Sequence, residues 1–125
     1  MIKVYVEKNL TAEELIRMSK NRESLLKAYL AYEEEGEEVE TYTRVELPVK
    51  VARKILSKRN IELLEVLSEK KVSSISNLAN ILHRSTSNVY RDLEFLRRYG
   101  LVSFIERGRQ KIPILLVRKI LIEIR

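Results

Sequence analysis

Three closely spaced segments between residues 57 and 100, each with the pattern of a helix, constrain the fold most. Each follows a serine that can cap a helix and carries apolar residues at helical spacing, and Gly100 can end the last one. The segments span residues 58–71, 75–82 and 86–99, and their caps are Ser57, Ser74 and Ser85. The last two are joined by a turn of about three or four residues, which is typical of a helix-turn-helix.

The segment after Gly100 has the pattern of a β-hairpin with a cationic tip. LVSFIE (101–106) and IPILLV (112–117) favour strands, and RGRQK (107–111) between them contains Gly108. Pro113 cannot donate to a strand ladder, so we expect it at an edge or a bulge. Three helices followed by this hairpin predict a winged helix-turn-helix.

The first 47 residues predict a strand, a helix and a second strand. MIKVYVEK alternates apolar and polar residues, Thr11 and Glu14 form a capping box, and VETYTRVEL (39–47) is rich in β-branched residues. Gly36 is a plausible helix stop. The acidic run EEEGEEVE (33–40) fits a solvated helix end and turn better than a decoy for a basic partner.

The segment after the second strand and the C-terminal tail complete the predicted architecture. Pro48 ends the second strand and suits the first turn of a short helix, PVKVARKIL. The tail KILIEIR alternates isoleucines and predicts a strand, which can pair with the N-terminal sheet or with a second subunit. We therefore predict an α+β, mainly helical fold: residues 1–47 form a strand-helix-strand element for dimerisation or partner binding, and residues 48–125 form a winged helix-turn-helix domain.

The charge of the chain is unevenly distributed. Its net charge is +6, but residues 1–56 carry a net −1 and residues 57–125 a net +7. This asymmetry favours a polyanionic partner such as nucleic acid, with a solvated basic surface as the alternative. The chain has no cysteine, a single histidine and no apolar run of about 18 residues. We therefore expect no cofactor, metal site, disulfide or membrane span, and a cytoplasmic protein.

The third helix separates an apolar stripe from a polar face. At about 100° per residue, Val89, Leu93 and Leu96 form the stripe, and Ser87, Arg91 and Arg98 lie opposite. The first turn is small and neutral, which lets a helix N-terminus approach phosphates and base edges in a major groove. Arg91 can fork onto guanine, Asn88 can pair with adenine, and Tyr90 can contact a phosphate or a thymine methyl. The alternatives are that Ser85 only caps the helix and Tyr90 only packs on a neighbour.

The predicted contact residues lie on the third helix, the turn before it and the hairpin tip. Cations at a flexible tip can follow the DNA backbone or enter a narrow minor groove. The set comprises Arg84, Ser85, Thr86, Ser87, Asn88, Tyr90, Arg91, Arg98, Arg107, Arg109, Gln110 and Lys111. His83, in the turn between the helices, fits a turn residue or a phosphate contact better than a metal ligand.

The run SISNLANILHRSTSNVYRDLEFLRRYGLV resembles the MarR/ArsR-type winged helix-turn-helix regulators of bacteria and archaea. The resemblance covers residues 48–125, and LEFLRRYGLV is its most specific part. The chain is similar in particular to small archaeal predicted regulators, which have a leading helix like ARKILSKRNIELLEVL and a closing strand like KILIEIR. The resemblance implies a dimeric, sequence-specific DNA-binding protein. The metal-sensing cysteines of many ArsR-type proteins are absent, and residues 1–47 match no effector domain.

We therefore expect a homodimeric transcriptional regulator that binds duplex DNA. Abundant Lys, Glu and Ile, with a single glutamine, are typical of a thermophilic source. The alternative is a protein-interaction winged helix, such as an antitoxin or an accessory factor of the transcription machinery. An enzyme is the least supported class, because the sequence contains no phosphate-cradling glycine motif, histidine-paired nucleophile or evident carboxylate pair.

Overall fold

The computed structural model describes residues 1–10 and 42–125, and this part of the chain has an α+β fold, as predicted. The helices are α3 (Val49–Ile55), α4 (Lys58–Glu69), α5 (Ile75–Leu82) and α6 (Thr86–Arg98). The strands are β1 (Lys3–Asn9), β2 (Tyr42–Leu47), β3 (Val102–Arg107), β4 (Gln110–Leu115) and β5 (Val117–Glu123). The predicted helix beginning at Thr11 and the acidic run at 33–40 lie outside the described residues.

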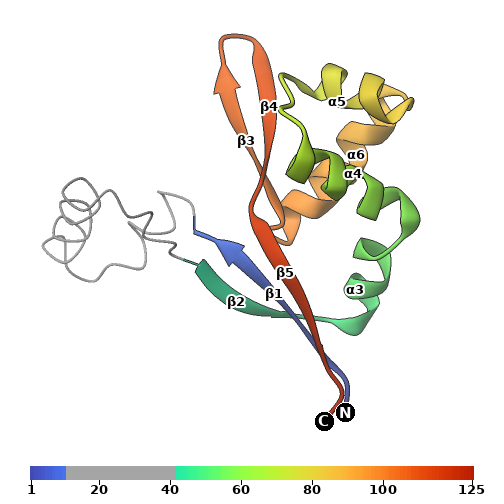
Figure 1. Cartoon of the computed structure of the whole chain (residues 1–125), viewed down its shortest axis with the longest axis vertical. Helices are drawn as coiled ribbons and strands as arrows, with labels where there is room; N and C mark the ends of the chain where they lie inside the picture. Colours follow the sequence, from blue (N-terminus) through green and yellow to red (C-terminus); the bar gives the residue numbers. More distant parts are fainter. Residues whose placement is uncertain (11–41) are drawn as a thin grey trace, which may run out of the picture. The chain divides into compact units, whose positions relative to one another are not determined.

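The N-terminal and C-terminal strands belong to one sheet. Its order is β2-β1-β5, and β5 runs antiparallel to β1, so that Lys3 lies opposite Glu123 and Val6 opposite Ile120. Figure 1 shows the two strands side by side, with the N- and C-termini adjacent. Of the two partners expected for the C-terminal strand, the structure therefore shows the N-terminal sheet.

Met1–Lys8 and Arg44–Arg125 form one compact unit. The pairing of β1 with β5 joins the first strand to the C-terminal part of the chain. Inside this sheet, the buried Glu7 carboxylate lies 3.6 Å from Arg44 Nη2 and 3.4 Å from Arg118 Nε.

One cluster of buried apolar side chains joins the helices to the hairpin. Leu63 of α4, Leu78 of α5 and Leu93 of α6 are fully buried in it. Burying such a side chain stabilises a fold by about 1.5–3 kcal/mol. The buried face of α4 centres on Leu63 and Asn60, which are fully buried, whereas Ile61 and Leu67 are only partly buried. Asn60 can be buried because its amide donates to the Lys54 carbonyl at 2.8 Å.

Two of the three predicted serine caps make the expected hydrogen bond. Ser74 Oγ accepts from Asn77 N at 3.0 Å, and Ser85 Oγ accepts from Asn88 N at 3.3 Å. Ser57 has the extended backbone of a cap, but its side chain makes no capping hydrogen bond, and its buried hydroxyl has no partner. The serine pattern therefore located all three helix starts, whereas the capping bond forms at two of them.

Two of the helices, α5 and α6, are followed by a residue in the left-handed conformation. Gly100, with φ +78°, follows α6; its N–H donates to the Arg97 carbonyl, and Leu101 N donates to the Leu96 carbonyl. This is a Schellman motif, and it ends α6 at the glycine that was predicted as its stop. His83 makes the equivalent turn after α5 with φ 54°, an unfavourable conformation for a residue with a side chain.

The β3–β4 hairpin is tighter than the sequence suggested. Arg107 lies opposite Gln110, so the loop contains only Gly108 and Arg109, and Gln110 and Lys111 belong to β4. Gly108 has φ +61° at the first loop position, which two-residue turns of type II′ reserve for glycine. Pro113 of β4 lies opposite Phe104 of β3. In the described part of the chain, β4 has a strand partner on one side only, so Pro113 lies in an edge strand, as expected.

Candidate functional site

The two faces of α6 separate as the helical spacing predicted. Val89, Leu93 and Leu96 are fully buried, whereas Arg91 and Arg98 are exposed. A helix with one face anchored in this way presents the other face in a fixed orientation. The outward face of α6 is therefore a rigid surface.

The first turn of α6 is open and lacks negative charge. Ser85, Thr86, Ser87 and Asn88 are all exposed, and the turn contains no acidic residue. Ser85 Oγ accepts from Asn88 N and lies 3.5 Å from Ser87 Oγ. Because no carboxylate offsets the positive end of the helix dipole, this turn attracts an anion.

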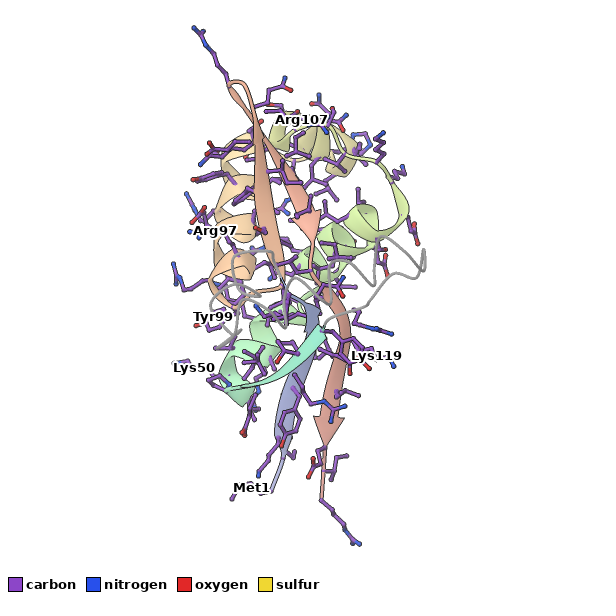
Figure 2. The ribbon with its side chains drawn as sticks, turned by 90° about the vertical axis from the view of Figure 1, so that its left-hand side faces the viewer. Met1, Lys50, Arg97, Tyr99, Arg107 and Lys119 are labelled. Carbon is purple, nitrogen blue, oxygen red and sulfur yellow. The ribbon has the colours of Figure 1, made fainter. Side chains whose placement is uncertain are left out.

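The hairpin brings a second exposed cationic group. Arg107, Arg109, Gln110 and Lys111 are exposed at and beside its turn. Figure 2 shows Arg107 near the end of the hairpin and Arg97 on α6, with Lys50 and Met1 toward the opposite end of the view. The cations predicted on the hairpin are thus available to a ligand.

Aromatic contacts connect the hairpin to α6. The rings of Tyr90 and Phe104 stack with centroids 6.5 Å apart and an interplanar angle of 18°, and Lys111 Nζ lies 5.8 Å from the Phe104 centroid. Tyr90 therefore packs on a neighbour, which was the alternative assignment, yet it remains 39% exposed and open to a ligand. The stack holds the hairpin beside the outward face of α6.

A groove of about 470 Å³ lies between α6 and the hairpin. Tyr90 and Phe104 line it together with Glu94, Arg97 and Lys111. Arg97 donates to Glu94 from Nη2 at 2.8 Å and from Nε at 3.3 Å. This hydrogen bonding holds the pKa of Glu94 below its ordinary value. Glu94 is therefore a carboxylate at neutral pH, and Arg97 offsets its charge.

Arg84 is placed differently from the other predicted contact residues. Its Nη2 donates to Asp92 Oδ2 at 2.6 Å, and its side chain is only 20% exposed. Arg59 of α4 approaches the same oxygen through Nε at 2.9 Å. The Arg84 guanidinium thus faces the protein, and its contact joins the α5–α6 turn to α6.

Sequence reasoning missed Asp92 and Arg59. Asp92 is three residues after Val89 and directly before Leu93, so the helical spacing places it at the margin of the apolar stripe. A carboxylate at such a position needs a cationic partner. That signal was present in the sequence, but it could not identify which of the many arginines would be the partner.

No group of three or more His, Asp or Glu side chains in residues 1–10 and 42–125 could hold a metal ion. None of the helices in these ranges is long and apolar enough to span a membrane.

Comparison with known proteins places the chain in a family. No curated protein matches the sequence. A family model with the description HVO_A0114 matches residues 55–122, which contain α4, α5, α6, the hairpin and most of β5. The matched segment covers more than half of the chain, and the chain therefore belongs to the HVO_A0114 family.

Proposed function

We propose that the chain is a sequence-specific duplex-DNA-binding regulator of transcription with a winged helix-turn-helix fold. In this proposal α5 and α6 are the helix-turn-helix, α6 enters the major groove, and the β3–β4 hairpin is the wing. The MarR/ArsR-type resemblance and the order of three helices followed by a hairpin support this assignment.

The observation that carries the proposal is the exposed polar surface of α6 beside the hairpin. Eleven of the twelve predicted contact residues are exposed, Arg84 being the exception. Duplex DNA needs cations for phosphates and forked or amide side chains for base edges. On α6, Arg91 and Asn88 supply the side chains for base edges. On the hairpin, the cations for phosphates are Arg107, Arg109 and Lys111.

Arg84 has a positioning role in the proposal. By holding Asp92, it fixes the turn that precedes the recognition helix, and Arg59 holds the same carboxylate from α4. This contact sets the angle at which the first turn of α6 meets the groove. Arg84 thus acts on DNA through the orientation of α6.

Selection from random duplex DNA, followed by titration at several salt concentrations, tests the proposal. We expect an enriched motif and a linear fall of log affinity with log salt, with a slope of about −0.9 for each phosphate neutralised. If the protein binds as a dimer, the motif should contain two half-sites about 34–36 Å apart, centre to centre. No enrichment, together with affinity independent of salt, would overturn the proposal.

A protein-interaction module is the second candidate, and one observation favours it. A groove of about 740 Å³ lies between the end of α4 and the hairpin, and its lining includes Leu67, Ile105 and Ile112. Ile105 is 45% exposed, which is unusual for a large apolar side chain beside other apolar groups. A partner bound by a protein that has no affinity for duplex DNA would favour this candidate.

A further inference from the structure

We propose that two copies of the chain associate through the outer edge of β5, forming one continuous sheet across a two-fold axis at Leu121. The strand order across the dimer is then β2-β1-β5-β5-β1-β2. This inference does not depend on DNA binding, because its argument uses only the three-stranded sheet and α4.

The outer edge of β5 is suited to pairing with a further strand. In the described part of the chain, β5 pairs with β1 on one side only. Beyond the buried part of the sheet, Ile122 is 54% exposed and Ile124 is 68% exposed. An exposed, isoleucine-rich edge strand is a template for pairing with another strand. The fold therefore leaves both backbone groups and apolar side chains for a partner.

The pattern of residues along β5 matches a second copy of itself. With the axis at Leu121, Lys119 lies opposite the partner's Glu123, and Ile120 lies opposite the partner's Ile122. Opposite charges and paired β-branched residues at directly opposed positions stabilise antiparallel strands. Each ion pair and each isoleucine pair occurs twice because of the symmetry.

The pairing of opposite charges and of apolar residues also extends to β1 of each copy. Within one copy Lys3 lies opposite Glu123 and Glu7 opposite Lys119, so one row across the four central strands alternates Lys, Glu, Lys, Glu. The neighbouring row begins with Val4 opposite Ile122 and ends with Ile120 opposite Val6, and it is entirely apolar. Moving the axis to Ile120 would oppose Lys119 to Leu121, and moving it to Ile122 would oppose Lys119 to Arg125. The Leu121 register is thus favoured by charge and by hydrophobicity.

An apolar groove lies where the partner's isoleucines arrive. It has a volume of about 330 Å³, and its lining includes Ile61 and Leu64 of α4 and Val117 and Ile120 of β5, with Glu65, Arg118 and Lys119 among the other lining residues. Because the partner's Ile122 lies opposite Ile120, it reaches the margin of this groove. Each copy then covers the exposed isoleucine of the other.

Cysteine crosslinking tests the register, because the chain contains no cysteine. Residues on the two-fold axis oppose themselves at about 4.5–5.5 Å between Cβ atoms, so Leu121→Cys should form a covalent dimer under oxidation or with a short bis-maleimide. Lys119→Cys alone should not, whereas a mixture of the Lys119→Cys and Glu123→Cys proteins should form the heterodimer. Equal crosslinking of Lys119→Cys and Leu121→Cys would overturn the proposal.

Sedimentation equilibrium tests the interface itself. The unmodified chain should have the mass of two copies, and Ile122→Lys with Ile124→Lys should raise the dissociation constant by on the order of 100-fold. Both side chains are exposed, so the thermal unfolding of the dissociated chain should be retained. Val45→Lys, which adds a lysine to the opposite edge strand β2, is the control for added positive charge on the sheet and should leave the dimer intact. A monomeric unmodified chain, or equal loss of the dimer in the control, would overturn the proposal.

The outcomes distinguish this inference from the proposed function. A dimer with the predicted crosslinks and no affinity for duplex DNA supports the β5 interface and counts against DNA binding. A chain that binds DNA and remains monomeric overturns the β5 interface alone.

Discussion

The helical part of the molecule and the three-stranded sheet differ in how completely they bury their apolar residues. In α4, α5 and α6, Leu63, Leu78 and Leu93 are fully buried. In the sheet, Val4 and Val6 are buried, but Ile122 on the neighbouring strand is more than half exposed. The helices thus complete their own core, whereas the sheet leaves apolar surface exposed, which we propose is covered by another copy. Stability and association should therefore respond to mutation in different parts of the chain.

The largest expected difference is between a buried leucine of α6 and an exposed isoleucine of β5. Leu93→Ala removes fully buried atoms and leaves a cavity, so it should lower the free energy of unfolding by about 2–5 kcal/mol. Ile122→Ala should change it by less than about 0.5 kcal/mol at concentrations too low for association. Urea unfolding of both variants measures the difference. Similar losses would show that the sheet is as tightly packed as the helices.

The buried carboxylates of the two regions give a smaller contrast. Asp92 has arginine nitrogens at 2.6 and 2.9 Å, whereas the arginine nitrogens nearest Glu7 lie at 3.4 and 3.6 Å. Asp92→Asn leaves the part-buried Arg84 without its counter-charge, so it should lower the free energy of unfolding by on the order of 2 kcal/mol. This loss is smaller than the loss from breaking a fully buried ion pair, because Arg59 is half exposed.

Glu7→Gln is the matched change in the sheet and should cost less than Asp92→Asn. Chemical unfolding of the two variants at neutral pH gives the ranking. The reverse ranking would mean that the sheet depends more on its ion pairs than the helical part does.

The turn between α5 and α6 offers a stabilising change. His83 has φ 54°, a conformation that glycine adopts without the steric conflict of a Cβ atom. His83→Gly should therefore raise the free energy of unfolding by about 0.5–1 kcal/mol, as measured by thermal or chemical unfolding. Destabilisation instead would show that the imidazole makes a contact that outweighs the backbone strain.

The smallest effect concerns the ion pair on the exposed side of α6. The hydrogen bond from Arg97 lowers the pKa of Glu94, so the Glu94 carboxylate binds a proton less readily in the folded state than in the unfolded chain. The resulting stabilisation is present above the unfolded pKa of Glu94 and is lost as the pH falls through its lowered folded pKa. Because the pair is exposed, Glu94→Gln should flatten the acid side of the stability profile only slightly. A steeper profile in the variant would contradict this sign.

Much of the fold followed from local patterns. Serine caps and the glycine after α6 marked the helices, and the apolar stripe of Val89, Leu93 and Leu96 fixed which side of α6 is buried. These features depend on neighbouring residues along the chain, which a sequence displays directly. The pairing of the C-terminal strand could be narrowed only to two partners, because strand pairing joins residues far apart in the chain.

The candidate site was predictable in its exposed residues and not in its internal contacts. Exposure of Arg91 and Arg109 followed from their place on a helix face and at a hairpin turn. The inward direction of Arg84 did not, since it depends on the position of Asp92 and on the packing of α4 against α6. The stack of Tyr90 on Phe104 likewise depends on how the hairpin folds back.

The most direct test of the account compares two arginine variants on a selected DNA sequence and on an unrelated one. Arg91→Ala should weaken the selected sequence and relax discrimination at one base pair by about 1–3 kcal/mol, whereas Arg109→Ala should weaken both sequences alike. Lys50→Ala removes the same charge from α3, away from the hairpin in Figure 2, and should leave both affinities nearly unchanged. If Arg91→Ala and Arg109→Ala lower both affinities to the same extent, α6 does not read the bases.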